Sequence, residues 1–304
     1  MANKYIIKDT MTHKAGFVNI VGNPNVGKST LSNVLVGERL SIITSKAQTT
    51  RHRIFGIVNE PEYQIVFSDT PGVLKPNYKL QETMLRFSQG ALYDADVLIY
   101  VTDTVEKPDK YDEFISAIKK IDSPILLIIN KIDLIDQEKL EKLVDYWAEE
   151  LPQAEIIPVS AMHSFNVHSI LKRIVELLPE AEPFFPKDAL TDKPERFFIT
   201  EIIREKILLY YQKEIPYSVE VEVEEFQDTN NLVNIRAVIH VARETQKGII
   251  IGHQGKALKK VGTDARKDIE VFLDKKVFLQ LYVKVTKDWR DKDRILKQFG
   301  YDPK

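Results

Sequence analysis

The sequence contains no cysteine. This absence excludes disulfide bonds, thiolate metal sites and a cysteine nucleophile, and it fits a reducing compartment. No apolar run approaches the roughly 20 residues that a membrane-spanning helix needs. Residues 1–14 lack the apolar core and the small-residue cleavage pattern of a secretory signal, so we expect no such signal. The formal net charge is only −2, so any attraction to nucleic acid must come from a local patch.

What is present fits an ordinary globular protein of two domains, with 304 residues of which 43% are hydrophobic and 29% charged. We predict a first domain over 1–182 that includes an N-terminal extension over 1–14, a linker over 183–195, and a second domain over 196–304. The linker prediction rests on four prolines set among acidic and polar residues, which favour a semi-rigid connection. A long surface loop inside one domain is the alternative. The prolines are Pro179, Pro183, Pro186 and Pro194.

In the first domain, short apolar runs alternate with segments of helical spacing. The runs cover 17–21, 54–58, 64–68, 97–102, 125–129 and 156–159, and the helical segments cover 29–36, 80–93, 109–120, 137–150 and 167–178. This alternation predicts an α/β domain, a mostly parallel sheet with helices on both faces. In such sheets ligands bind at the carboxyl ends of the strands.

The first apolar run leads into a phosphate-binding motif of the form G-x-x-x-x-G-K-S. Its residues are Gly22, Asn23, Pro24, Asn25, Val26, Gly27, Lys28 and Ser29, and Thr30 follows. Glycines let successive backbone N–H groups point at phosphate oxygens, and the next helix adds positive partial charge. We expect Lys28 to reach the β- and γ-phosphates and Ser29 to ligate Mg²⁺. An ordinary glycine-rich turn is the alternative.

Three further polar motifs follow later strands. They are Asp69-Thr70-Pro71-Gly72, Asn130-Lys131-Ile132-Asp133 and Ser160-Ala161. Asp69 can hold Mg²⁺ through water, and the Gly72 N–H can contact a γ-phosphate. The Asp133 carboxylate can accept from N1–H and the amino group of guanine, whereas adenine would leave it unpaired. The order and placement of the motifs predict a site for GTP or GDP with Mg²⁺.

With these motifs, residues 15–180 resemble the GTPase domain of the translation-factor class. The resemblance implies that Gln48-Thr49-Thr50-Arg51 is the first switch and that residues 69 to about 86 form the second. It implies that a threonine of the first switch ligates Mg²⁺; we favour Thr50, with Thr49 as the alternative. The catalytic residues are then expected to be Lys28, Thr50, Asp69 and Gly72.

Val73 occupies the position at which small signalling GTPases carry the glutamine that orients water. The sequence therefore resembles the hydrophobic-substituted subclass of GTPases. In that subclass an asparagine at the Asn25 position helps to bind K⁺, and such a cation would offset charge that develops in the transition state. We predict slow intrinsic hydrolysis that K⁺ stimulates more than Na⁺.

The second domain shows a different order of elements: helix, strand, strand, helix, helix, strand. This order predicts a compact α+β module. Within it lies a G-x-x-G loop followed by lysines, a combination that can clamp a nucleic-acid backbone. A tight helix–helix turn with a solvated charged face is the alternative. The candidate RNA-binding residues are Gly252, His253, Gln254, Gly255, Lys256, Lys259 and Lys260.

This half resembles a type II KH domain, and with the ending 284–290 and 300–301 almost the whole chain resembles the bacterial Era family of GTPases. The resemblance implies a ribosome-assembly GTPase that binds 16S rRNA near its 3′ end as single-stranded RNA, engages the 30S ribosomal subunit, and is cytoplasmic with possible peripheral contact with the inner face of the membrane. Two other classes are weighed against it, a P-loop phosphotransferase with an appended domain and a GTP-dependent RNA-modifying enzyme. A phosphotransferase would need a substrate pocket and a lid in place of switches and would have no use for the motif Asn130–Asp133, and no further catalytic constellation supports an RNA-modifying enzyme.

Overall fold

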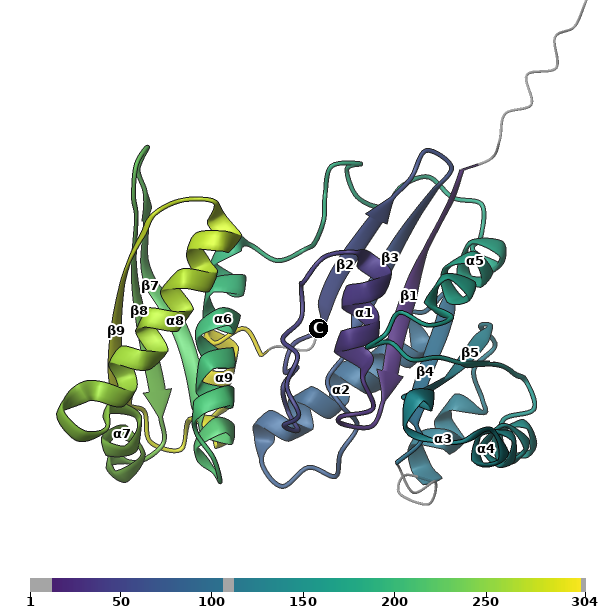
Figure 1. Ribbon diagram of the computed structural model, residues 1–304, viewed down its shortest axis with the longest axis horizontal. Helices are drawn as coiled ribbons and strands as arrows, with labels where there is room; N and C mark the ends of the chain where they lie inside the picture. The colour runs from purple at the N-terminus through teal and green to yellow at the C-terminus, as the bar shows by residue number, and fades with distance from the viewer. Residues whose placement is uncertain (1–12, 106–111, 302–304) are drawn as a thin grey trace, which may run out of the picture.

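The computed structural model describes residues 13–105 and 112–301, which form two bodies side by side (Figure 1). The first is an α/β body and the second an α+β body, as the sequence predicts, so the expected fold class is confirmed. Within the described ranges no helix is both long and apolar enough to cross a membrane.

A six-stranded sheet forms the centre of the first body, in the order β2-β3-β1-β4-β5-β6. The strands are β1 (Lys14–Gly22), β2 (Ile54–Asn59), β3 (Tyr63–Asp69), β4 (Val97–Asp103), β5 (Ile125–Asn130) and β6 (Ala154–Pro158). Only β2 runs antiparallel to its neighbour; the other pairs are parallel. The central strands are buried on both faces, which explains why their sequences are apolar at nearly every position.

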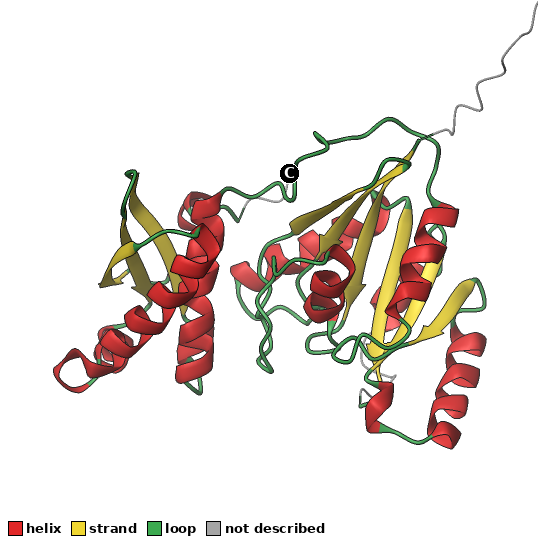
Figure 2. Ribbon diagram, turned by 45° about the horizontal axis from the view of Figure 1, so that its top comes forward, coloured by secondary structure: helices red, strands yellow, loops and turns green. Residues whose placement is uncertain are grey.

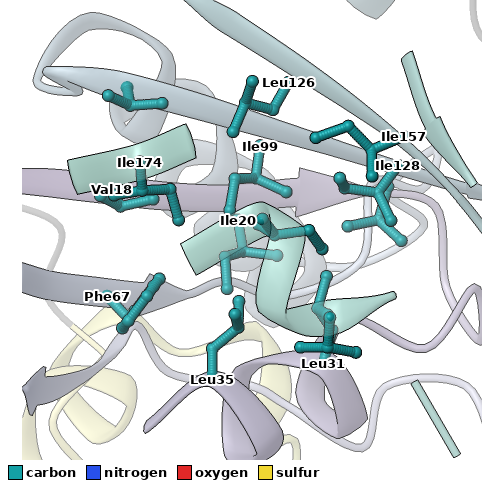
Figure 3. Packing of buried hydrophobic residues seen from close by; sticks show 14 of the residues in the cluster. Val18, Ile20, Leu31, Leu35, Phe67, Ile99, Leu126, Ile128, Ile157 and Ile174 are labelled. Carbon is teal, nitrogen blue, oxygen red and sulfur yellow. The ribbon is translucent and has the colours of Figure 1, made fainter. Parts of the chain in front are cut away.

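Helices cover both faces of this sheet (Figure 2). They are α1 (Lys28–Val36), α2 (Lys79–Tyr93), α3 (Asp112–Ile118), α4 (Gln137–Glu150) and α5 (Val167–Leu177). On one face α1 and α5 pack against strand residues such as Ile20 and Ile99 (Figure 3). On the other face α2, α3 and α4 pack around Leu98 and Leu127. The helix predicted over 109–120 is described only from Asp112; residues 109–111 lie outside the described ranges.

The stretch between the two bodies lies along the outer edge of β2. The Leu190 carbonyl accepts from the Ile57 N–H at 2.9 Å, and Asn59 donates to the Ala189 carbonyl at 2.9 Å. Gln64 further holds the chain at Phe185. The prolines therefore occur in a segment that pairs with a strand edge rather than in a spacer that stands clear of both bodies, because an edge strand offers free N–H and C=O groups.

The second body is a three-stranded sheet, β7-β8-β9, covered on one face by helices. Its elements are α6 (Glu195–Tyr210), β7 (Val219–Asp228), β8 (Val233–Val241), α7 (Glu244–Ile251), α8 (Lys256–Leu273), β9 (Val277–Val285) and the short α9 (Asp293–Gln298). Strands β7 and β8 are antiparallel, and β8 and β9 are parallel. Along β7 the valines Val219 and Val221 face the helices and alternate with glutamates, but Glu220 on the other face is only 6% exposed. Its burial comes from the first body.

Candidate nucleotide and nucleic-acid sites

The polar motifs of the first body meet at the carboxyl ends of β1, β3 and β5, around a cavity of about 510 Å³. The predicted residues that line it are Pro24, Asn25, Gly27, Lys28, Ser29, Thr30, Gln48, Thr49, Thr50, Gly72 and Lys131. The predicted Asp69, Asn130, Asp133, Ser160 and Ala161 do not line this cavity. Others support the site from outside the cavity. Val26 and Val73 are buried in the two hydrophobic cores, and Ile132 packs against one of them.

The phosphate-binding loop leaves β1 at Gly22 and enters α1 after Gly27. Both glycines have positive φ, 145° and 97°. A Cβ on Gly22 would lie 2.2 Å from the Val101 carbonyl oxygen, and one on Gly27 would lie 2.2 Å from the Asn130 amide nitrogen. Only glycine satisfies these two positions. The loop also encloses Lys28, which is 6% exposed and donates from Nζ to the Asn23 carbonyl at 2.8 Å.

Ser29, Thr50 and Asp69 bring three oxygen-bearing side chains together beside α1. Ser29 Oγ lies 2.8 Å from Thr50 Oγ1 and donates to Asp69 Oδ2 at 2.8 Å. Asp69 is 1% exposed, and burial raises the pKa of its carboxyl group while hydrogen bonds to it and Lys28 oppose the shift. Its Oδ1 atom is buried without a hydrogen-bond partner. Hydroxyl and carboxylate oxygens in this arrangement fit Mg²⁺, which prefers oxygen ligands.

Thr49, the alternative ligand, has a different environment. Its Oγ1 lies 2.7 Å from Thr44 Oγ1 and donates to the Lys46 carbonyl at 2.6 Å, so the hydroxyl is used inside its own loop. The geometry favours Thr50 as the Mg²⁺ ligand, because the Thr50 hydroxyl is hydrogen-bonded to Ser29 and the Thr49 hydroxyl is not.

The base-reading motif lies at the end of β5. Asn130 is 2% exposed; it donates to the Val26 carbonyl and accepts from the Ala161 N–H, both at 2.9 Å, and so fastens the phosphate loop to the last motif. Ser160 Oγ donates to Asp133 Oδ1 at 2.5 Å, and this hydrogen bond is the main reason why the pKa of Asp133 is lowered. The carboxylate is ionised at neutral pH and can accept from guanine.

The segment after β3 turns against the phosphate loop. A Cβ on Gly72 would lie 2.7 Å from the Pro24 Cα, so the two loops touch through backbone. Thr70 donates to the Ile20 carbonyl at 2.7 Å, and Pro71 accepts from Ser88 of α2 at 2.7 Å. Val73 is 3% exposed and its N–H bonds to the Gly22 carbonyl at 3.1 Å.

Sequence reasoning missed several residues of this cavity. Met162, with 83% of its surface exposed, lines the cavity, and the loop that leads into the first switch adds Ile42, Ile43, Thr44, Ser45 and Lys46. The signal for Met162 was its position directly after Ser160-Ala161. The isoleucines gave no signal, because apolar residues in a predicted loop are as easily explained by packing.

In the second body, the G-x-x-G loop joins α7 to α8. Gly252 has φ 69°, and a Cβ there would meet the Ala257 Cβ at 2.6 Å; Gly255 has φ 73° with open space where a Cβ would be. His253 and Gln254 between them are exposed. The loop therefore presents two free side chains and one open glycine.

A groove of about 350 Å³ lies beside this loop, between α8 and β9. Its lining is Gly255, Leu258, Lys259, Gly262, Thr263, Arg266, Leu279 and Leu281. An apolar floor with cations at the rim suits unstacked bases joined by phosphates. Of the other predicted lysines, Lys260 lies over the Tyr210 ring at 4.1 Å from its centroid, and Lys256 is exposed at the start of α8.

Comparison with known proteins places two family models on the chain. A model described as a 50S ribosome-binding GTPase matches residues 17–131, and a KH domain model matches residues 214–290. The GTPase Era of Alkaliphilus metalliredigens is 45% identical over 295 residues, covering 96% of this chain and all of the relative. The GTPase Era of Clostridium kluyveri is 44% identical over 292 residues, covering 95% and 99%.

Solved structures agree. The chain is similar, with a TM-score of 0.92 and 40% identity, to the crystal structure of Era in complex with MgGDPNP and nucleotides 1506–1542 of 16S ribosomal RNA, covering 96% of this chain and all of that one. A variant of Aquifex aeolicus Era bound to GDP·AlF4⁻ gives a TM-score of 0.91 and 39% identity, covering 95% and 100%. Both matches extend over the two bodies.

Proposed function

Because the chain belongs to the Era family of GTPases, we propose that it is a GTP-controlled switch that binds 16S rRNA near its 3′ end and assists assembly of the 30S ribosomal subunit. The observation that carries this proposal is the match over both bodies to an Era structure that holds a GTP analogue and that RNA. The KH groove beside the Gly252–Gly255 loop is the surface for single-stranded RNA.

Hydrolysis of GTP is assigned to the cavity of the first body. We assign Ser29 and Thr50 as ligands of Mg²⁺ and Asp69 as a partner through water, supported by their mutual distances and by the unpartnered Asp69 oxygen. The ion, when bound, neutralises charge on the phosphates. Lys28 and the N–H groups of the loop bind the same phosphates, the Gly72 N–H contacts the terminal one, and Asp133 selects guanine.

Val73 leaves hydrolysis without a side chain that orients water, since it is packed in the core. We infer that K⁺ bound near Asn25 supplies part of the missing stabilisation. Support comes from a contact of this side chain with the loop that leads into the first switch: Asn25 Nδ2 donates to the Ser45 carbonyl at 3.2 Å, so a side-chain amide and a backbone carbonyl lie together beside the phosphate loop. Carbonyl and amide oxygens suit a monovalent cation.

We further propose the domain limits 1–182 and 196–304 with a linker over 183–195, and a cytoplasmic location with possible peripheral contact with the inner membrane surface. The two alternatives weighed from the sequence, a phosphotransferase and an RNA-modifying enzyme, are not favoured by family membership. A phosphotransferase would also have no use for Asp133 as a guanine reader.

The proposal is tested by two assays on the purified full chain. The first measures phosphate release from GTP and ATP in KCl and in NaCl at equal ionic strength; we expect turnover of GTP only, and faster in KCl. Equal turnover of GTP in the two salts would contradict the proposed K⁺ site but not the GTPase activity. The second measures binding of an oligonucleotide from the 3′ end of 16S rRNA against a scrambled one; equal affinity for both would contradict the RNA assignment.

A further inference from the structure

The loop between α1 and β2, residues 37–53, contains the first switch and lies along the second body. Its partners lie on α6, in the segment that follows α6, and at the start of β7. The pairs are Arg39 with Glu205, Lys46 with the carbonyls of Leu208 and Tyr211, Thr49 with Arg204, and Arg51 with Pro216, Val219 and Glu220. Figure 1 shows the loop between α1 and β2 on the side that faces α6.

Arg51 is the most deeply inserted of these residues, with no exposed surface. Its guanidinium donates to the Val219 carbonyl at 2.7 Å, to the Pro216 carbonyl at 3.0 Å and to Glu220 at 3.1 Å. Tyr301 in turn donates to the same Glu220 carboxylate at 2.7 Å. A buried guanidinium needs such partners, so the side chain has little freedom while the two bodies are together.

Thr50 is held on both sides by these contacts. The carbonyl of Thr49, which belongs to the peptide preceding Thr50, accepts from Arg204 Nη2, and the next residue is the buried Arg51. Between them the Thr50 side chain lies against Ser29 at 2.8 Å. The backbone that aims this hydroxyl at the magnesium position is thus fixed by the RNA-binding body.

We propose that Arg204 and Glu220 of the RNA-binding body are positioning residues for the nucleotide site. Arg204 binds the Thr49 carbonyl and Glu220 binds the Arg51 guanidinium, so together they hold the residues on either side of Thr50, whose hydroxyl meets Ser29. This inference rests on the proposed role of Thr50. Neither residue lines the nucleotide cavity, so neither is expected to touch the phosphates. The nucleotide site is therefore completed across the interface, by groups that act through the peptide chain.

The support of Thr50 by the RNA-binding body should favour binding of the triphosphate over the diphosphate. A switch threonine is ordered by Mg²⁺ and the γ-phosphate, so support of Thr50 stabilises the state that holds GTP and contributes little to the state that holds GDP. By linkage, GTP must strengthen the contact between the switch and the RNA-binding body by the same free energy.

The same interface provides a matched control. Residues of the C-terminal segment pack against α2: Trp289 and Leu296 join Leu80 and Met84 in one buried cluster. At its rim Lys79 Nζ lies 2.6 Å from Asp293 Oδ2, both partly exposed. Asp293→Asn makes the same acid-to-amide change as Glu220→Gln at the same domain interface, but its partner Lys79 belongs to the segment expected to be the second switch, not to the loop that carries Thr50. Because this ion pair is partly exposed, its loss should cost little and leave the support of Thr50 intact.

The experiment measures dissociation constants of fluorescent GDP and of a fluorescent non-hydrolysable GTP analogue, with and without Mg²⁺, for the full-length wild type, Glu220→Gln and Asp293→Asn. In Mg²⁺ we expect Glu220→Gln to raise the dissociation constant of the GTP analogue about tenfold and that of GDP less than about twofold. Asp293→Asn should change neither dissociation constant. Hydrogen exchange of the peptide over 44–53 with the analogue bound should rise in Glu220→Gln only.

An unchanged analogue affinity in Glu220→Gln would overturn the inference, as would equal weakening of both nucleotides with faster exchange throughout the chain. Arg204→Lys supplies a second reading, because lysine keeps the charge next to Glu201 but loses the planar donor that reaches the Thr49 carbonyl. It should reproduce the selective loss. If wild-type affinity for the analogue does not depend on Mg²⁺, the proposed role of Thr50 itself fails, which is a distinct result.

Discussion

The phosphate-binding loop and the Gly252–Gly255 loop are both glycine turns that open a helix, yet their surroundings differ. In the first loop, a Cβ on Gly22 or Gly27 would meet backbone or a buried side-chain amide at 2.2 Å. In the second, Gly252 meets Ala257 whereas Gly255 meets nothing within 4 Å. The first loop is fixed by neighbours from other strands, and the second only by the turn between two helices.

This difference separates two ways to bind phosphate. In the nucleotide site the ligand groups are positioned before the ligand arrives, through bonds such as those of Asn130 and Asp69 to other motifs. In the KH groove Lys259 is exposed and can adjust to a longer, flexible ligand, whereas Arg266 is half-buried and paired with Glu270 at 2.9 Å. Substitutions should therefore have sharp, specific effects at the first site and graded, salt-dependent effects at the second.

The largest effect is expected for Asp133→Asn. The amide no longer accepts from both guanine donors, so preference for GTP over XTP should fall by roughly 10³-fold or more. Competition of the two nucleotides for a fluorescent GDP analogue measures this. Ser160→Ala removes the 2.5 Å hydrogen bond to the Asp133 carboxylate but keeps that carboxylate. It should lower the affinity for GTP without altering the selectivity between GTP and XTP. Unchanged selectivity in Asp133→Asn would contradict the base-reading role.

Lys28→Ala should lower the turnover number by about 100-fold or more, because a cation next to the phosphates is lost from a water-poor site. Single-turnover phosphate release measures the loss. Thermal unfolding without nucleotide shows whether the fold persists, since Lys28 also bonds to the Asn23 carbonyl. Turnover close to that of the wild type in a folded variant would disprove the assignment.

At the KH loop, His253→Asp combined with Gln254→Asp should weaken RNA binding about tenfold and leave hydrolysis of GTP unchanged. Both side chains are exposed, so the fold is spared, whereas a side chain at Gly252 would collide with Ala257. Asp264→Asn on α8 is a control that removes a negative charge. Loss of both activities in the double variant would show that the two bodies are not separable.

The smallest effect concerns His240. Burial lowers its pKa below 6.5 although Glu222 opposes the shift, so the folded protein binds fewer protons at His240 than the unfolded chain. The free energy of unfolding should therefore fall as the pH drops below about 6.5. Urea titrations at about pH 7.5 and about pH 5.5 should show a smaller difference for His240→Gln. If the wild type and His240→Gln lose the same free energy of unfolding between the two pH values, His240 is not the source of the pH dependence.

The sequence was sufficient for the order of elements and for the nucleotide motifs, because buried parallel strands and phosphate loops depend on local patterns. Apolar runs predicted each strand of the first sheet to within a few residues. Gly22 and Gly27 could be recognised because the steric demand on them is absolute. The guanine-reading role of Asp133 stays a prediction, which follows from the two hydrogen-bond donors of guanine.

Contacts across the interface could not be predicted. In a pattern of alternating valines and glutamates, Glu220 looks like a solvated residue, and only the packing of the first switch buries it against Arg51. The proline-containing stretch likewise gave no sign that it would pair with β2. Such features depend on which surfaces meet, and periodicity within one element carries no information about that.

The central claim is that nucleotide and RNA are coupled across this interface. The direct test is the affinity of the full-length protein for a 3′-end 16S rRNA oligonucleotide, measured by fluorescence anisotropy with saturating GDP and with a saturating non-hydrolysable GTP analogue in Mg²⁺. The account predicts binding that is about fivefold or more tighter with the analogue. Equal affinity in the two nucleotide states would contradict it.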